Sequence, residues 1–169
     1  MPTKAKSTES AKSDKLFYFV ANVVVYHESD KKCLILKRHS REKVHPNKWA
    51  VPGGKLEWGD FDLENPTRMN GDVIDFENAI EKLLRRETLE EAGIEIQDYL
   101  EYINSVFFVR PDGIPEILVR FAAKYKEGEV SLEEDAFTDF AWVDEDEVMK
   151  CDCIEGVKDE VKKTMKIFS

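Results

Sequence analysis

The sequence predicts an α/β domain in which helices cover both faces of a mixed β-sheet. Strand-like apolar segments alternate with amphipathic helical segments, and no repeat or linker divides them. The length of 169 residues suits one domain with a single buried core. We therefore expect one domain over residues 15–169, preceded by a flexible polar tail over residues 1–14.

The expected strands are rich in β-branched and aromatic side chains, as in LFYFVANVVVY at residues 16–26. Pro52-Gly53-Gly54 predicts a loop, because glycine and proline interrupt regular structure. Pro111-Asp112-Gly113 predicts a turn between two neighbouring strands. The complete set of expected strands is 16–26, 33–37, 105–110, 116–126 and 140–143.

Two segments are predicted to be helical. The first runs from Phe76 to Ala92, with Asp75 as its N-cap and Gly93 as the residue that ends it. The second lies near the C-terminus and is expected to be capped by Asp152. Its apolar residues recur at helical spacing, at Ile154, Val157, Val161, Met165 and Phe168.

The charge balance limits the partners that this chain can bind. A formal net charge of −10 argues against a protein that coats nucleic acid or an anionic membrane, because phosphate groups need a basic surface. Phosphorylated small molecules remain acceptable if a divalent cation lies between the acids and the phosphate. The longest apolar run is too short to cross a bilayer, and the first residues do not resemble a secretory signal.

The cysteines favour a reducing compartment. Cys33, Cys151 and Cys153 are odd in number, and two of them are one residue apart, which is a poor basis for disulfides. No second Cys/His pair accompanies Cys151 and Cys153, so we assign no metal site to them. We expect a cytoplasmic protein.

The first predicted helix carries acids on its apolar face. On a helical wheel, Glu87, Glu90 and Glu91 extend the stripe that contains Leu83 and Leu84. Like charges at this spacing repel by a few tenths of a kcal/mol per pair. Anions in the last turns cost roughly a further 0.3–1 kcal/mol each. A hard cation such as Mg²⁺ or Mn²⁺ would offset this cost, whereas the alternative is a solvated acidic helix end.

Two segments together carry a family resemblance. The sequence WAVPGGKLEWGD at residues 49–60 and RETLEEAGI at residues 86–94 resemble the Nudix hydrolase signature, G-x5-E-x7-R-E-U-x-E-E-x-G-U, where U is apolar. The second half matches at every fixed position, and Thr88 is a weaker match at a U position. The resemblance implies a Nudix-type α/β/α sandwich with a mixed β-sheet, and a MutT-like pyrophosphohydrolase.

The first half of the signature departs from the family pattern. Asp60 stands where the family has Glu, and an insertion around residues 61–78 separates the loop from the helix. Counting back from Arg86 instead places Asn78 at this acidic position, with Glu77 beside it. The sequence leaves open which of these residues fills it. The insertion is either a lid or specificity loop, or a neutral surface segment.

The resemblance assigns cation binding to one set of residues. Glu87, Glu90 and Glu91 would bind Mg²⁺ or Mn²⁺, together with the backbone carbonyl of Gly53. Gly54 and Gly93 would be structural. Arg86 would tie the loop to the helix through a carboxylate such as Glu57.

Catalysis and substrate binding involve further candidates. The general base is either Glu87 or an acid at residues 133–135, from which we select Glu134. Arg38 is a candidate for binding a phosphate, and Trp58 for stacking on a base, although Trp58 could instead pack on the insertion.

The sequence is compatible with two functions. The favoured one is a metal-dependent hydrolase that cleaves a pyrophosphate bond in a nucleoside diphosphate linked to another group. Its substrate would be a nucleoside triphosphate, an oxidised nucleotide or a nucleotide sugar such as ADP-ribose. The alternative is a non-catalytic module of the same fold that senses a nucleotide or a protein. Either a monomer or a homodimer is compatible with the sequence.

Overall fold

The computed structural model describes residues 10–169, so residues 1–9 of the expected tail lie outside the described part. Eight strands form the main sheet, in which the order β10-β2-β1-β9-β7 is extended by β3 on β2, β4 on β1 and β8 on β9. Strand β1 runs parallel to β9, and the other neighbours in this sheet are antiparallel. Their bounds are β1 Tyr18–His27, β2 Lys32–Arg38, β3 Trp49–Ala50, β4 Gly53–Lys55, β7 Glu95–Ile96, β8 Glu101–Val109, β9 Pro115–Glu127 and β10 Phe137–Val143.

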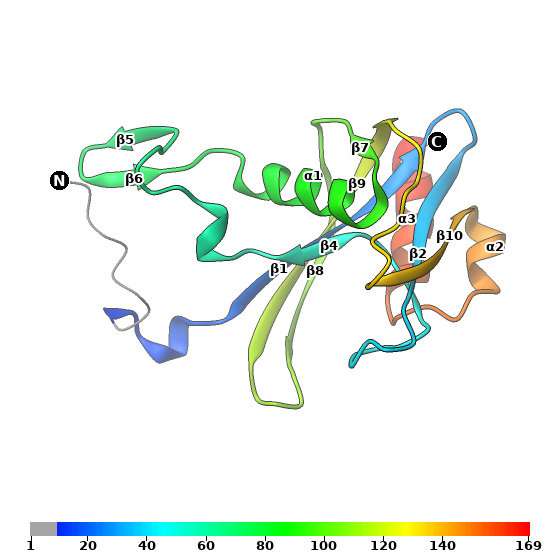
Figure 1. Cartoon of the computed structure of the whole chain (residues 1–169), viewed down its shortest axis with the longest axis horizontal. Helices are drawn as coiled ribbons and strands as arrows, with labels where there is room; N and C mark the ends of the chain where they lie inside the picture. The colour runs from blue at the N-terminus through cyan, green and yellow to red at the C-terminus, as the bar shows by residue number, and fades with distance from the viewer. Residues whose placement is uncertain (1–9) are drawn as a thin grey trace.

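Helices α1 (Ala79–Ala92) and α3 (Val157–Phe168) pack on opposite faces of this sheet (Figure 1). Alternate residues of a strand point to opposite faces, so β1 and β2 contribute to two cores. One core joins the strands to α1 through Val23, Val25, Leu34, Leu36, Leu83 and Leu84. The other joins them to α3 through Val24, Tyr26, Cys33, Ile35, Val157 and Val161. The predicted α/β sandwich with a mixed sheet is confirmed.

The insertion contains a hairpin of its own, which extends away from the main sheet (Figure 1). Strands β5 (Arg68–Asn70) and β6 (Val73–Asp75) pair antiparallel. Asp75 therefore ends a strand and binds Arg68, and the prediction that it caps the first helix is wrong. The helix begins later, after Asn78, whose left-handed φ of 57° turns the chain into it.

Two other local expectations need correction. Gly53 and Gly54 do not form a loop, because Gly53–Lys55 is β4 and pairs with residues 20–22 of β1. Asp152 does not cap the last helix, which begins at Val157 after Gly156. The side chain of Asp152 binds Lys48 instead.

A short helix was not expected from the sequence. Helix α2 (Glu145–Met149) is capped by Asp144, whose carboxylate accepts hydrogen bonds from the backbone N–H groups of Asp146 and Glu147. At five residues it is too short to show a helical period. None of the helices in the described part of the chain is long and apolar enough to cross a membrane.

Candidate functional site

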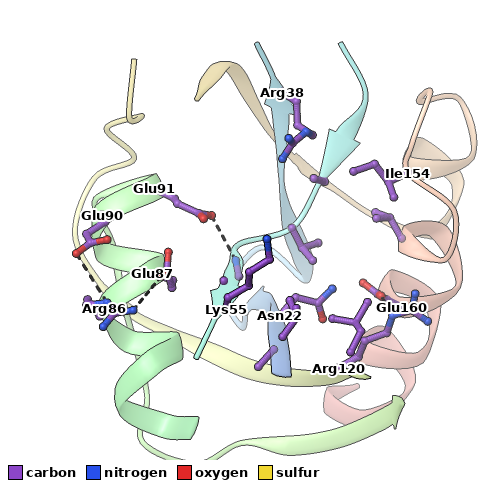
Figure 2. A pocket seen from close by; sticks show the side chains of 18 of the residues that line it. Asn22, Arg38, Lys55, Arg86, Glu87, Glu90, Glu91, Arg120, Ile154 and Glu160 are labelled. Atoms are coloured by element: carbon purple, nitrogen blue, oxygen red, sulfur yellow. Dashed lines mark hydrogen bonds and ion pairs between the residues drawn. The ribbon is translucent and has the colours of Figure 1, made fainter. Parts of the chain in front are cut away.

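A cavity of about 740 Å³ lies between the C-terminal half of α1, strand β4 and the start of α3. Figure 2 shows the acids of α1 on one side and Asn22, Arg120 and Glu160 on the other, with Lys55 between them. A volume of this size is typical of pockets for small molecules. We call the side lined by α1 the acidic end, and the side lined by Asn22, Arg120 and Glu160 the far end.

Two glycines allow close approaches to β4 at the acidic end, Gly54 that of α1 and Gly53 that of β1. A Cβ atom at Gly54 would lie 2.5 Å from Oε1 of Glu87, and one at Gly53 would lie 2.5 Å from the carbonyl oxygen of Ala21. The backbone N–H of Gly53 donates a hydrogen bond to Oε2 of Glu91 at 3.3 Å. The glutamates and the glycine segment are therefore in contact, as the sequence predicted.

The surroundings of Glu87 and Glu91 disfavour the ionised form of both side chains. Burial, and next the charge of Glu87, raise the pKa of Glu91 to about 9. Burial also raises the pKa of Glu87, although the Arg86 guanidinium opposes this. Both acids are thus partly withdrawn from water, and within residues 10–169 no ion pair joins Glu91 to a cationic side chain.

Arg86 connects α1 to the segment before the insertion. Its guanidinium binds Asp60 and also donates to Oε1 of Glu87 at 3.0 Å. The expected partner Glu57 is replaced by Asp60, which reaches Arg86 from the short 3₁₀ helix Trp58–Asp60. Although burial opposes it, the Glu57 backbone N–H and the Arg86 guanidinium hold the pKa of Asp60 below its ordinary value.

The contact between Asp60 and Arg86 helps to decide which residue occupies the first acidic position of the signature, which the sequence left open between Asp60, Glu77 and Asn78. Asp60 lines the cavity beside Arg86. Glu77 binds Arg68 of the insertion hairpin, and Asn78 is the N-cap of α1. Of the three candidates, the structure brings only Asp60 to the acidic end.

Other expected site residues are divided between the cavity and the surface. Glu90 and Arg38 line the cavity. The side chain of Glu90 is 58% exposed, so it is more solvated than its place on the wheel indicated. Arg38 is held by the carbonyl of Val44 and by Glu42, both at 3.0 Å. Gly93 ends α1 in the left-handed conformation, as predicted.

Glu134 and Trp58 are not among the residues that line the cavity. Glu134 is exposed, and Trp58 is 63% exposed. The neighbouring acid Glu133 is nearer to the site, because its backbone N–H donates to the carbonyl of Glu91 at 3.1 Å. Its charge also raises the pKa of Glu91.

The donor set of the acidic end fits a hard divalent cation. Carboxylate oxygens are the ligands that Mg²⁺ and Mn²⁺ prefer, and Glu87 and Glu91 provide them side by side. Within residues 10–169, no three Asp, Glu, His or Cys side chains are already gathered at metal-binding distance. Part of the reason is that Arg86 holds Glu87. A cation that binds Glu87 would therefore compete with the Arg86 guanidinium for this carboxylate.

The far end contains residues that were not among the candidates predicted from the sequence. Glu160 of α3 is 1% exposed and forms an ion pair with Arg120 of β9. Burial raises the pKa of Glu160 to about 7, while Arg120 and the Asn22 amide lower it. A signal was present in the sequence, because Glu160 lies directly before Val161 on an otherwise apolar helix face. Asn22 likewise interrupts an apolar strand.

Comparisons with known proteins agree on one family. The NUDIX domain family matches residues 69–165 of the chain. Nudix hydrolase 19, chloroplastic, of Arabidopsis thaliana is 26% identical over 132 residues, which are 78% of this chain and 25% of that protein. The chain thus spans about a quarter of the length of this curated relative.

Solved structures share the fold. A MutT protein from Methanosarcina mazei Go1 has a TM-score of 0.62 and 18% identity, with 92% of this chain and 98% of that chain covered. The NUDIX domain of Shewanella oneidensis NrtR, complexed with ADP ribose, has a TM-score of 0.65 and 15% identity, with 99% of both chains covered. A Caenorhabditis elegans Ap4A hydrolase has a TM-score of 0.58 and 18% identity, with coverage of 89% and 96%.

Proposed function

This chain belongs to the Nudix hydrolase family, and we propose that it hydrolyses a pyrophosphate bond in a nucleoside diphosphate linked to a second group, with Mg²⁺ or Mn²⁺ as cofactor. Candidate substrates are nucleoside triphosphates, oxidised nucleotides, and nucleotide sugars such as ADP-ribose. A small nucleotide is therefore the expected partner.

The observation that carries this proposal is the pair Glu87 and Glu91 at the glycine segment. Burial raises the pKa of both carboxyls, and the charge of Glu87 further raises the pKa of Glu91, so ionisation of the pair is unfavourable without additional positive charge beside it. A divalent cation supplies that charge, and when bound it neutralises the phosphate oxygens under attack. The carboxylates of Glu87, Glu90 and Glu91 and the carbonyl of Gly53 are the groups proposed to hold it.

The residues of this chain have distinct roles in the proposed reaction. Lys55 and Arg38 lie along the cavity between its two ends and supply positive charge for the phosphates (Figure 2). Arg86 orients Glu87 through a hydrogen bond at 3.0 Å. Of the two candidates for the general base, Glu87 lines the cavity and Glu134 does not. We therefore assign to Glu87 the proton of the attacking water.

The direct test is a panel of pyrophosphate-containing nucleotides incubated with the purified protein, with the products identified by mass spectrometry. The panel should include nucleoside triphosphates, dinucleoside polyphosphates and nucleotide sugars, each with Mg²⁺, with Mn²⁺ and with EDTA. Cation-dependent cleavage of at least one substrate is expected. Cleavage that persists in EDTA would contradict the role of the acidic end.

A non-catalytic sensor module is the second candidate. Retention of the fold with loss of an acid from residues 86–91 would favour it, but this chain keeps Glu87, Glu90 and Glu91. Tight nucleotide binding without turnover of any panel member would identify the sensor in place of the enzyme.

A further inference from the structure

The outer edge of strand β8 is unpaired in the part of the chain that the structure describes. One side of β8 forms a ladder with β9, and no strand within residues 10–169 pairs with its other side. The ladder is regular over residues 104–109, because its register shift lies between Tyr102 and Asn104. The end of the β8–β9 hairpin extends beyond α1 and α3 (Figure 1). Free backbone N–H and C=O groups along such an edge can pair with a strand of another chain.

The same edge is apolar and uncharged. Residues 102–109 (YINSVFFV) include no Asp, Glu, Lys or Arg, although these four types make up 36% of the chain. Phe107 and Val109 are among the most exposed apolar side chains, at 59% and 61%. Natural edge strands commonly carry charges or proline, which prevent pairing between chains. Residues 102–109 have neither, so this edge is open to a partner.

Exposed apolar side chains occur on both faces of β8. Successive residues of a strand point to opposite faces, so Phe107 and Val109 lie on one face and Val106 and Phe108 on the other. All four side chains are exposed. A membrane surface or a docked helix would cover only one of these faces. A strand added beside β8 would pack its own side chains against both faces at once.

We propose that β8 pairs antiparallel with β8 of a second copy of this chain, which joins the two main sheets into one. The added strand must be uncharged and apolar on both faces, and β8 itself meets this requirement. A two-fold axis perpendicular to the sheet relates the two strands and keeps corresponding faces together. Although each copy has a net charge of −10, residues 102–109 bring no charge to the interface. The proposal is independent of the proposed hydrolysis.

The exposed area at this edge is that of a reversible dimer. The side chains of Tyr102, Val106, Phe107, Phe108 and Val109 are 36–61% exposed. Aromatic side chains bury roughly 150–250 Å² each, so the exposed parts of these five amount to about 450 Å² per copy. Stable interfaces bury about 800 Å² per partner, and smaller ones are typical of transient complexes. Salt should strengthen the dimer, because it screens the repulsion between two acidic chains.

Sedimentation velocity of the whole chain tests the proposal without reference to activity. Between about 1 and 200 μM, the mass should rise from the 19.6 kDa of one chain towards twice that value. The dimer fraction should be larger in about 0.5 M NaCl than in about 0.05 M. The mass of a single chain at every concentration in both salts would overturn the proposal.

Val109→Lys tests whether the dimer uses β8, because both copies would bring a charge to the interface. The dissociation constant should rise at least about tenfold. Val73→Lys in β6 is the matched control, since Val73 is also a strand valine and is 60% exposed. This control should leave the constant unchanged, and circular dichroism should show both variants folded. An unaltered constant in Val109→Lys would contradict the proposal.

Hydrogen exchange followed by mass spectrometry distinguishes strand pairing from contact elsewhere. Amides on the free edge of β8 exchange readily in the monomer, whereas pairing would engage them in hydrogen bonds. Peptides that cover residues 104–109 should therefore exchange several-fold more slowly at high protein concentration, and peptides that cover residues 68–70 should not change. A dimer that protects other segments but leaves residues 104–109 unprotected would refute pairing through β8.

Discussion

The carboxylate of Asp60 binds the guanidinium of Arg86 across 26 residues of sequence, and most of the intervening chain is the insertion with its hairpin. The contact fastens the segment after β4 to the acidic turns of α1. Arg86 reaches Glu87 from the same position. The geometry of the acidic end therefore depends on this pair.

A double-mutant cycle measures the strength of the pair. Asp60→Asn and Arg86→Ala should each lower the free energy of urea-induced unfolding, with a coupling energy of about 1 kcal/mol, since both side chains are partly exposed. Arg86→Lys should recover only part of it, because an ammonium lacks the planar fork that binds two carboxylates. A coupling energy of zero would show that the contact contributes nothing to stability.

Gly54→Ala tests the close approach of Glu87 to β4. The added methyl group would meet Glu87 at 2.5 Å, so the carboxylate must move away from the cavity. We expect kcat/KM to fall roughly 10- to 100-fold while circular dichroism and unfolding remain near those of the parent protein. Gly59→Ala is the matched control, because a Cβ atom there meets nothing within 4 Å. Equal activity of the two variants would contradict the account.

The raised pKa of Glu91 predicts how stability depends on pH when no cation is present. The folded protein keeps the proton of Glu91 up to about pH 9, whereas the unfolded chain loses it near the ordinary value of 4.5. Raising the pH between these values therefore favours unfolding, by at most about 1.4 kcal/mol per pH unit and by less where water reaches the side chain.

Urea unfolding in EDTA from pH 5 to pH 8.5 checks this expectation. Glu160, whose pKa is about 7, adds a decline of the same sign at the acid end of the range, so the interval above pH 7 reports mainly on Glu91. Glu91→Gln should flatten the decline above pH 7, and Mg²⁺ should stabilise the parent protein more at pH 8 than at pH 5. Identical slopes for variant and parent would exclude Glu91 as the cause.

Much of the fold followed from local sequence patterns. The long strands are continuous apolar runs, and α1 shows a clear period that ends at Gly93, so both could be predicted. The start of α1 could not be predicted from the sequence. Residues 73–75 pair with residues 68–70, and this pairing overrides the preference of Asp75 for a helix N-cap. Strand β4 was missed because its glycines are strand residues only through their ladder with β1.

Local sequence patterns likewise predicted only part of the candidate site. Glu87 and Glu91 were found because acids on an apolar helix face break a local rule, which needs no tertiary information. The choice among Asp60, Glu77 and Asn78 depends on a contact across the insertion, which no local pattern specifies. Asn22 and Glu160 each break the same rule singly, and only the packing of α3 on the sheet brings them to one cavity.

The carboxylate of Glu91 is proposed to hold a cation that cleavage needs, and the activities of three proteins decide whether it does. Mg²⁺-dependent release of product from the best substrate should be measured for the parent protein, Glu91→Gln and the matched control Glu81→Gln, which lies in the first turn of the same helix. We predict that Glu91→Gln remains folded and loses at least about 100-fold in kcat/KM, as expected when a group that stabilises transition-state charge is removed. Glu81→Gln should keep parental activity. Parental turnover in a folded Glu91→Gln protein would contradict the account.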